Sequence, residues 1–237
     1  KPMIADATPP AANHHPTVTP LKTIAIPAGA RTGTEAISRV LADPNTAVPD
    51  LIRGTAKLLI EEIRLLESRV SQLERELAAL ARLSPACTTL LSIPGIGLLT
   101  ATAMVAATSS DVSHFKDARH FSSWFGLTPK EYSSGTSRYL GRISKKGDRH
   151  LRMMLTHGAR SVLRASKVAE SAGREVCGVR RWALDVQARG NHNKAACALT
   201  NKLTRICYAT LRDKEPFDEQ TVRLSKKISR ESFVMPA

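Results

Sequence analysis

The chain has 237 residues, 42% of them hydrophobic, which is enough for one or two domains with a buried core. Its formal net charge of +14 favours a polyanionic partner, most often a nucleic acid. Aromatic residues make up only 4% of the chain, which argues against stacking on unpaired bases as its main means of binding. The longest apolar run, from Leu90, is interrupted at Pro94 and is too short to span a bilayer, so we expect no membrane association.

The four cysteines are widely spaced and form no Cys-x-x-Cys pair. This spacing argues against a zinc site and suits a reducing compartment. The first residues are rich in proline and threonine, unlike the apolar stretch of a secretory signal. We therefore expect a cytoplasmic, nucleoid-associated protein with no metal ligands in this chain.

The two ends of the chain differ in composition from its middle. Six prolines fall within the first 30 residues, so we expect residues 1–50 to form a disordered or loosely packed leader. Residues 216–237 are charged, and we expect them to form a frayed tail. The folded part is then expected between residues 51 and 215.

Residues 51–84 carry a long amphipathic pattern. Apolar residues recur at alternating spacings of four and three from Ile52 to Leu80, while charged residues such as Glu61, Arg69 and Glu74 avoid that stripe. The pattern predicts a long coiled-coil helix that pairs copies of the chain into a homo-oligomer. The alternative is a long helix that folds back on its own domain.

The remaining pattern predicts a compact helical domain over residues 85–215, because Ala, Leu, Arg and Lys dominate and favour helix over sheet. The fold class is therefore predicted to be all-α. Pro85 is expected to end the long helix, and Asp148 is expected to cap a later one. The later helices are expected at residues 98–108, 117–125, 148–165, 174–189 and 193–211, with a basic turn segment before residue 148.

The sequence IPGIG, at residues 93–97, lies between two predicted helices and has the pattern of a helix-hairpin-helix motif. Its glycines can adopt backbone angles that are closed to other residues. The peptide N–H groups of Gly95, Ile96 and Gly97 would then face outward at a helix N-terminus, where they can bind a DNA phosphate. The alternative is an ordinary glycine-rich turn between two helices.

Positive charge is concentrated between residues 130 and 167, where ten Lys and Arg residues are opposed by two acidic residues. Such a density predicts contact with nucleic-acid phosphates. The residues assigned to DNA binding in this segment are Lys130, Arg138, Arg142, Lys145, Lys146, Arg149 and Arg152.

The same segment holds Ser133 and Ser134, directly before Gly135. A serine hydroxyl attacks phosphorus only when a base removes its proton and cations stabilise the charge that develops. The neighbouring Arg and Lys residues can supply the cations, and the base candidates are His150, His157, Glu131 and Asp148. The alternative is a solvated basic loop, because Ser-Ser-Gly is also common in turns.

The motifs IPGIG, GLTP, SSG, KKGDRHLR and HGAR occur in that order, followed by NKAACALTNKLTRICYATLR. In order and spacing they resemble the C-terminal half of the insertion-sequence transposases of the IS110 type, relatives of the Piv DNA invertase. The resemblance runs from about Ile52 to Arg212.

The resemblance implies a helical C-terminal domain whose serine attaches covalently to DNA, preceded by a coiled coil and an N-terminal RuvC-like domain with four acidic metal ligands. The serine directly before the glycine, Ser134, matches the family's nucleophile, and Ser133 is the alternative. Mg²⁺ is implied only for the RuvC-like domain. The implied partners are double-stranded DNA and, for some members, a structured guide RNA.

About 50 residues precede the coiled-coil pattern, which is fewer than a RuvC-like domain needs. We therefore expect a truncated copy that by itself has little or no strand-transfer activity. Its function is then either that of a DNA-binding transposase part with a serine nucleophile, or that of a non-catalytic helix-hairpin-helix remnant that binds DNA and dimerises. A role in assembly through the coiled coil alone is the third hypothesis.

Overall fold

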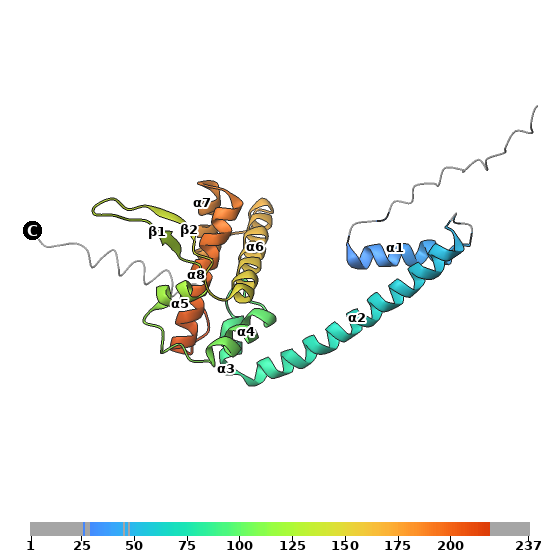
Figure 1. Ribbon diagram of the computed structural model, residues 1–237, viewed down its shortest axis with the longest axis horizontal. Helices are drawn as coiled ribbons and strands as arrows, with labels where there is room; N and C mark the ends of the chain where they lie inside the picture. The colour runs from blue at the N-terminus through green and yellow to red at the C-terminus, as the bar shows by residue number, and fades with distance from the viewer. Residues whose placement is uncertain (1–25, 27–28, 45, 47, 219–237) are drawn as a thin grey trace, which may run out of the picture. The chain divides into compact units, whose positions relative to one another are not determined.

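The computed structural model describes residue 26 and residues 29–44, 46 and 48–218 (Figure 1). This part of the chain contains eight helices and one two-stranded sheet, so the predicted all-α class is confirmed. The elements are α1 (Ala30–Ala42), α2 (Asp50–Leu83), α3 (Pro85–Leu91), α4 (Leu98–Thr108), α5 (Ala118–Trp124), β1 (Pro129–Glu131), β2 (Leu140–Ile143), α6 (Arg149–Ser171), α7 (Gly178–Ala188) and α8 (His192–Asp213). Residues 1–25 of the predicted leader and residues 219–237 of the predicted tail lie outside the described residues.

The chain forms two compact units that join between Gln72 and Leu73. In the first unit, residues 30–42 form the helix α1, which corrects the prediction of a loosely packed leader up to residue 50. The abundant prolines favoured a disordered leader, although the apolar residues of this segment recur at helical spacing. Leu41 of α1 and Ile60 of α2 are both buried, as an amphipathic helix packed on a neighbour requires.

Arg53 of α2 holds the C-terminal end of α1. Its Nη1 donates to the carbonyl of Leu41 at 2.6 Å, and its Nη2 donates to the carbonyl of Thr46 at 3.2 Å. The last carbonyls of a helix have no partner within the helix, so a guanidinium placed there satisfies them. Arg64, one turn beyond Ile60 on α2, donates from Nη2 to the Ser38 hydroxyl at 3.0 Å.

The helix α2 runs from Asp50 to Leu83, and the predicted a/d stripe remains exposed along most of it. Leu66 is 48% exposed and Val70 is 53% exposed, although both are large apolar side chains. Ile60, which lies beside the stripe, is buried. The stripe is therefore available to another helix, and its pairing stays a prediction.

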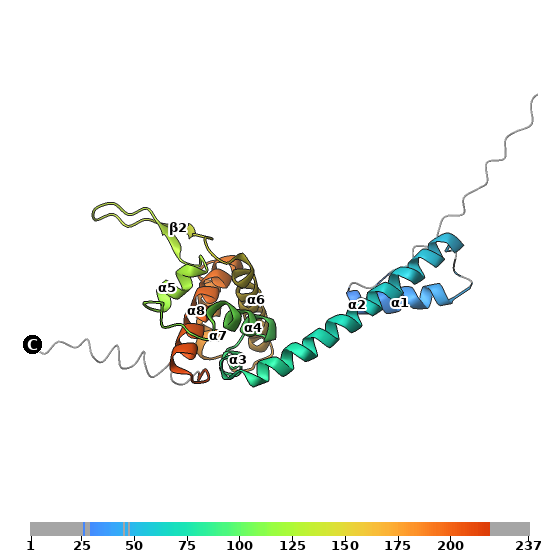
Figure 2. The same cartoon turned by 60° about the horizontal axis from the view of Figure 1, so that its bottom comes forward.

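The helix α8 lies at the centre of the second unit and packs against α3, α5, α6 and α7 (Figures 1 and 2). One face of α8 is buried, since Leu199 and Leu203 are fully buried. The predicted cap at Asp148 is confirmed. The Asp148 carboxylate accepts from the Leu151 N–H at 2.8 Å at the start of α6, and the Asn191 side chain accepts from the Lys194 N–H at 2.9 Å at the start of α8.

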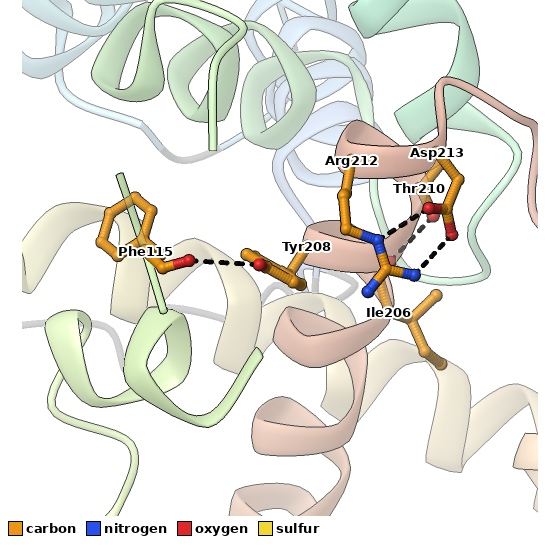
Figure 3. A network of polar contacts seen from close by, with 6 residues as sticks. All are labelled: Phe115, Ile206, Tyr208, Thr210, Arg212 and Asp213. Atoms are coloured by element: carbon orange, nitrogen blue, oxygen red, sulfur yellow. Dashed lines mark hydrogen bonds and ion pairs between the residues drawn. The ribbon is translucent and has the colours of Figure 1, made fainter. Parts of the chain in front are cut away.

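A polar network joins the end of α8 to the loop before α5 (Figure 3). The buried Tyr208 hydroxyl donates to the Phe115 carbonyl at 3.2 Å. The Arg212 guanidinium lies 5.8 Å from the centre of the Tyr208 ring and makes two hydrogen bonds with Asp213. This network fixes the loop that leads into α5, from which the basic segment continues.

The ordered structure extends slightly beyond the predicted domain end at residue 215. Phe217 packs against the core, and its N–H donates to the Ser92 hydroxyl at 2.7 Å. The charged residues around it had predicted a frayed tail from residue 216, but one aromatic side chain next to an apolar surface is enough to hold the segment.

The IPGIG loop meets α6 through two glycines. Gly95 has a φ of 85°, and a Cβ atom placed on Gly158 of α6 would lie only 1.9 Å from the Gly95 carbonyl oxygen. Backbone therefore touches backbone here, which only glycine permits. The adjoining Ile93 and Ile96 side chains are buried in the core.

We expect Gly158→Ala to destabilise the second unit by about 2 kcal/mol, because the added methyl group overlaps a backbone oxygen. The measurement is chemical denaturation. Gly54→Ala is the matched control, since Gly54 lies in α2 with nothing within 4 Å of its Cβ position. Alanine there should raise helix stability by up to about 1 kcal/mol. Equal effects of the two substitutions would contradict the close approach.

Candidate nucleic-acid interface

The predicted basic turn segment is a β-hairpin that stands out from the helices in both views (Figures 1 and 2). Strands β1 and β2 pair antiparallel, and Ser134 and Ser137 exchange two backbone hydrogen bonds of 3.0 Å at the tip. Gly135 has a φ of 57° between them, which suits the first central position of a two-residue hairpin turn. The hairpin was not predicted from the sequence, because strands of three and four residues leave too short an alternation to recognise.

Ser133 makes a specific contact near the tip of this hairpin. Its hydroxyl donates to the Glu131 Oε1 at 2.7 Å, and the Arg138 Nε donates to the same oxygen at 3.2 Å. The hydrogen bond from Ser133 and the positive charge of Arg138 hold the pKa of the Glu131 carboxyl below its usual value, although partial desolvation acts in the opposite direction. The lowered pKa favours the ionised carboxylate, which accepts the hydrogen bond from Ser133.

Ser134 is exposed at the tip, and its hydroxyl has no hydrogen-bond partner among the described residues. Tyr132 and Tyr139 form a cross-strand pair with ring centroids 6.0 Å apart, which stabilises the hairpin behind the tip. Arg138 lies within the same hairpin. The structure thus presents Ser134 to solvent beside a cation, but not within a groove.

The root of the hairpin is fixed to the helical body by the backbone. The Lys145 N–H donates to the Gly126 carbonyl at 3.0 Å, and the Arg152 Nη1 donates to the Phe125 carbonyl at 2.9 Å. Arg152 is half-buried and therefore holds α5 against α6, in addition to any role with DNA. The exposed cations in this region are Lys130, Arg138, Arg142, Lys145, Lys146 and Arg149.

The IPGIG loop joins α3 and α4, which pack against each other. Gly97 is the N-cap residue of α4 and makes no side-chain cap, and the first residues of that helix line a groove of about 650 Å³. Ile96 is buried, and its N–H already donates to the Ile93 carbonyl at 3.0 Å. The Ile96 N–H is therefore engaged within the turn, and the phosphate-binding role of Gly95 and Gly97 stays a prediction.

The structure does not bring the serines and the IPGIG loop together. The loop contacts α6 at Gly158, whereas the hairpin joins α6 at its N-cap, Asp148. These positions are about 15 Å apart along the helix axis at 1.5 Å per residue. The hairpin then extends away from the helices, which increases the separation (Figure 1).

In the sequence, the cations of residues 130–167 form one segment. In the structure, some of them lie on or near the hairpin and others lie farther along α6. Arg160, Arg164 and Lys167 lie far from the hairpin and line a separate groove. Their spacing of four and three residues was the available signal, because it places them on one face of a helix.

No group of three His, Cys, Asp or Glu side chains is placed to bind a metal ion in the described ranges of the chain. The same ranges contain no helix that is both long enough and apolar enough to cross a bilayer.

These features match a class of proteins that move DNA segments. Residues 87–173 match the family described as "Transposase IS116/IS110/IS902 family", and this part of the chain belongs to that family. The match covers the IPGIG loop, the hairpin and α6.

Similar proteins support the assignment. The chain is 36% identical over 175 residues to a probable family 20 transposase of Pseudomonas aeruginosa, covering 74% of this chain and 50% of that protein. It is 31% identical to the transposase for insertion sequence element IS1111A of Coxiella burnetii, covering 80% and 50%. It is 29% identical to a pilin gene-inverting protein of Moraxella bovis, covering 68% and 48%. The chain therefore spans about half the length of these relatives.

The Glu131 contact gives a pH-dependent prediction. Because the pKa of the folded carboxyl is lowered, the contact with Ser133 is complete above the usual carboxyl range and is lost as pH falls through the lowered value. Ser133→Ala should move the Glu131 pKa up towards the ordinary value of 4.5, as followed by NMR titration. Ser134→Ala is the control and should leave that pKa unchanged. Equal pKa values in the unaltered chain and the Ser133→Ala variant would refute the contact.

Proposed function

We propose that this chain is the DNA-binding part of an insertion-sequence transposase and that Ser134 attacks a DNA phosphodiester during site-specific transposition. The observation that carries this proposal is an exposed serine at the tip of a cationic hairpin, inside the segment that matches the transposase family. The relatives named as transposases and as a gene-inverting protein support the same class of reaction, DNA rearrangement.

In the proposed step, the Ser134 Oγ attacks phosphorus and forms a serine–phosphate ester. The bond from phosphorus to one sugar oxygen breaks, and that oxygen leaves as a hydroxyl after taking up a proton. Arg138 and the hairpin cations would stabilise the negative charge that develops on the phosphoryl oxygens. A base must remove the serine proton, and Glu131 is the carboxylate that the hairpin itself supplies.

Ser133 is the alternative nucleophile, and its contact with Glu131 is the observation that favours it. A hydroxyl that already donates to a carboxylate at 2.7 Å has its proton acceptor in place. The Ser134 hydroxyl is free among the described residues, whereas the Ser133 hydroxyl is bonded to the Glu131 carboxylate. The two serines can therefore be separated only by substitution.

The resemblance implies Mg²⁺ in a RuvC-like domain. The described residues of this chain offer no three-ligand cluster that would fit such an ion, so we derive no step from it here. We propose that double-stranded DNA is the main partner. A structured guide RNA is a further partner that the resemblance implies for some members, and it would compete with duplex DNA for the cationic surfaces.

A non-catalytic role is the second candidate function. The exposed amides at the start of α4 and the cations around the hairpin could hold a DNA backbone without any covalent step. The exposed stripe of α2 favours dimerisation in either case. A chain of this kind would bind DNA and pair with other copies.

Ser134→Ala should reduce the covalent protein–DNA adduct by at least about 100-fold, because the alanine has no nucleophile. The assay supplies a family RuvC-like domain in trans, uses labelled element-end DNA and reads the adduct on a denaturing gel. Ser133→Ala is the matched control and should retain most of the adduct. If Ser134→Ala retains the adduct and Ser133→Ala loses it, Ser133 is the nucleophile. Salt-sensitive DNA binding without an adduct from any variant supports the non-catalytic role.

Leu66→Asp combined with Val70→Asp should convert a homo-oligomer to a monomer at micromolar concentration. Both side chains lie on the exposed stripe of α2, and a carboxylate buried in a helix–helix seam costs several kcal/mol, on the order of the values for unpaired buried charges. The measurement is light scattering coupled to size exclusion. Glu67→Gln is the control because it lies off the stripe. An unaltered chain that is monomeric at this concentration would exclude pairing through α2.

A further inference from the structure

Three cations on α6 form a row that is separate from the hairpin. Arg160, Arg164 and Lys167 follow one another at spacings of four and three residues and are all exposed. They line a groove of about 600 Å³ together with Gln187 of α7 and His192 of α8. The groove therefore combines side chains from three helices of the second unit.

The positive charge of this groove is not neutralised by the surrounding protein. In the described part of the chain, none of the three cations has an acidic partner. The nearby carboxylate on α6, Glu170, is already paired with Arg181 at 2.6 Å. Across residues 160–194 the sequence has eight Lys and Arg against three acidic residues.

The start of α8 adds to the positive potential. His192 is the first residue of this 22-residue helix, and the N-terminal end of a helix carries partial positive charge from its unpaired N–H groups. The Asn191 side chain caps only one of these groups, the Lys194 N–H. An anion in the groove would therefore meet a helix terminus as well as three cationic side chains.

The groove adjoins the one at the start of α4. Ser161 lines both, and His157, one turn before it on α6, lines the second. Glu74 is the acidic side chain among the described residues that line this second groove. The two grooves meet at Ser161 and form a track along α6, with the start of α4 lining one groove and the start of α8 lining the other.

The chemistry of this track favours a double-stranded ligand. No described Phe, Tyr or Trp side chain lines either groove, so the large rings that most often stack on unpaired bases are missing from both linings. A row of cations beside helix N-termini is suited to phosphate oxygens, which a duplex presents on its outside. A single strand would leave its bases without contacts here.

We propose that the groove lined by Arg160, Arg164 and Lys167 binds the sugar–phosphate backbone of duplex DNA and anchors it independently of the hairpin serines. The proposal rests on the proposed function in one respect, the choice of DNA as the polyanion. The anchor reads no sequence, because it contacts phosphates and not base edges. It holds the duplex on the rigid helical body while the hairpin remains free to reach a phosphodiester.

The test is the triple variant Arg160→Gln, Arg164→Gln and Lys167→Gln of the full chain, bound to a labelled 30-base-pair duplex and followed by fluorescence anisotropy. Removing three phosphate contacts should reduce the slope of the logarithm of the binding constant against the logarithm of salt concentration by about 2.7. This change corresponds to roughly 100-fold weaker binding at 0.15 M salt. The control is Lys57→Gln, Arg69→Gln and Arg82→Gln, which removes the same charge from exposed positions of α2.

The control variant should bind like the unaltered chain. Replacing Arg160 and Arg164 by lysine should preserve the salt slope, because each phosphate still meets a cation. If the groove variant binds the duplex as tightly as the control, the anchor is wrong while the proposed function stands. A chain that binds no duplex at all would overturn both. Tighter binding of a single-stranded DNA or an RNA than of the duplex would overturn the choice of ligand.

Discussion

The arrangement of the second unit depends on the contact between Gly95 and Gly158. Because backbone touches backbone there, the α3–α4 pair lies closer to α6 than any side chain would permit. This close approach places the first turn of α4 beside His157 and Ser161. It thereby joins a helix terminus to the cationic face of α6. Without this contact, the IPGIG loop and the α6 cations would be two unrelated surface features.

The helical part of the fold could be predicted because its signals are local. Asp148 caps α6 through a side chain only three residues from the N–H group that it accepts from, so the sequence alone predicted this cap. The hairpin was missed because its short strands depend on the turn at Gly135. The helix α1 was missed because neighbouring prolines outweighed its apolar pattern.

The candidate site was predictable in its residue types but not in its grouping. The sequence showed one basic segment, whereas the fold divides it between a hairpin, a structural contact and a groove. Arg152 illustrates the difficulty, since its guanidinium donates to the Phe125 carbonyl. Arg160, Arg164 and Lys167 illustrate the reverse, since their common face becomes a site only when α7 and α8 supply the other wall. A count of charges along the sequence does not show which helices will face one another across a groove.

The position of Ser134 has a physical consequence for any chemistry it performs. A hydroxyl at a solvent-exposed tip is a weak nucleophile, because water surrounds it and screens the cations that would stabilise a developing charge. Its surroundings must become drier before attack, and a bound DNA strand would displace water from the tip. A duplex held on α6 would bring phosphates towards the hairpin without requiring the hairpin itself to bind them tightly. Under the two proposals, anchoring falls to α6 and attack falls to the hairpin, so different elements of the fold would serve the two tasks.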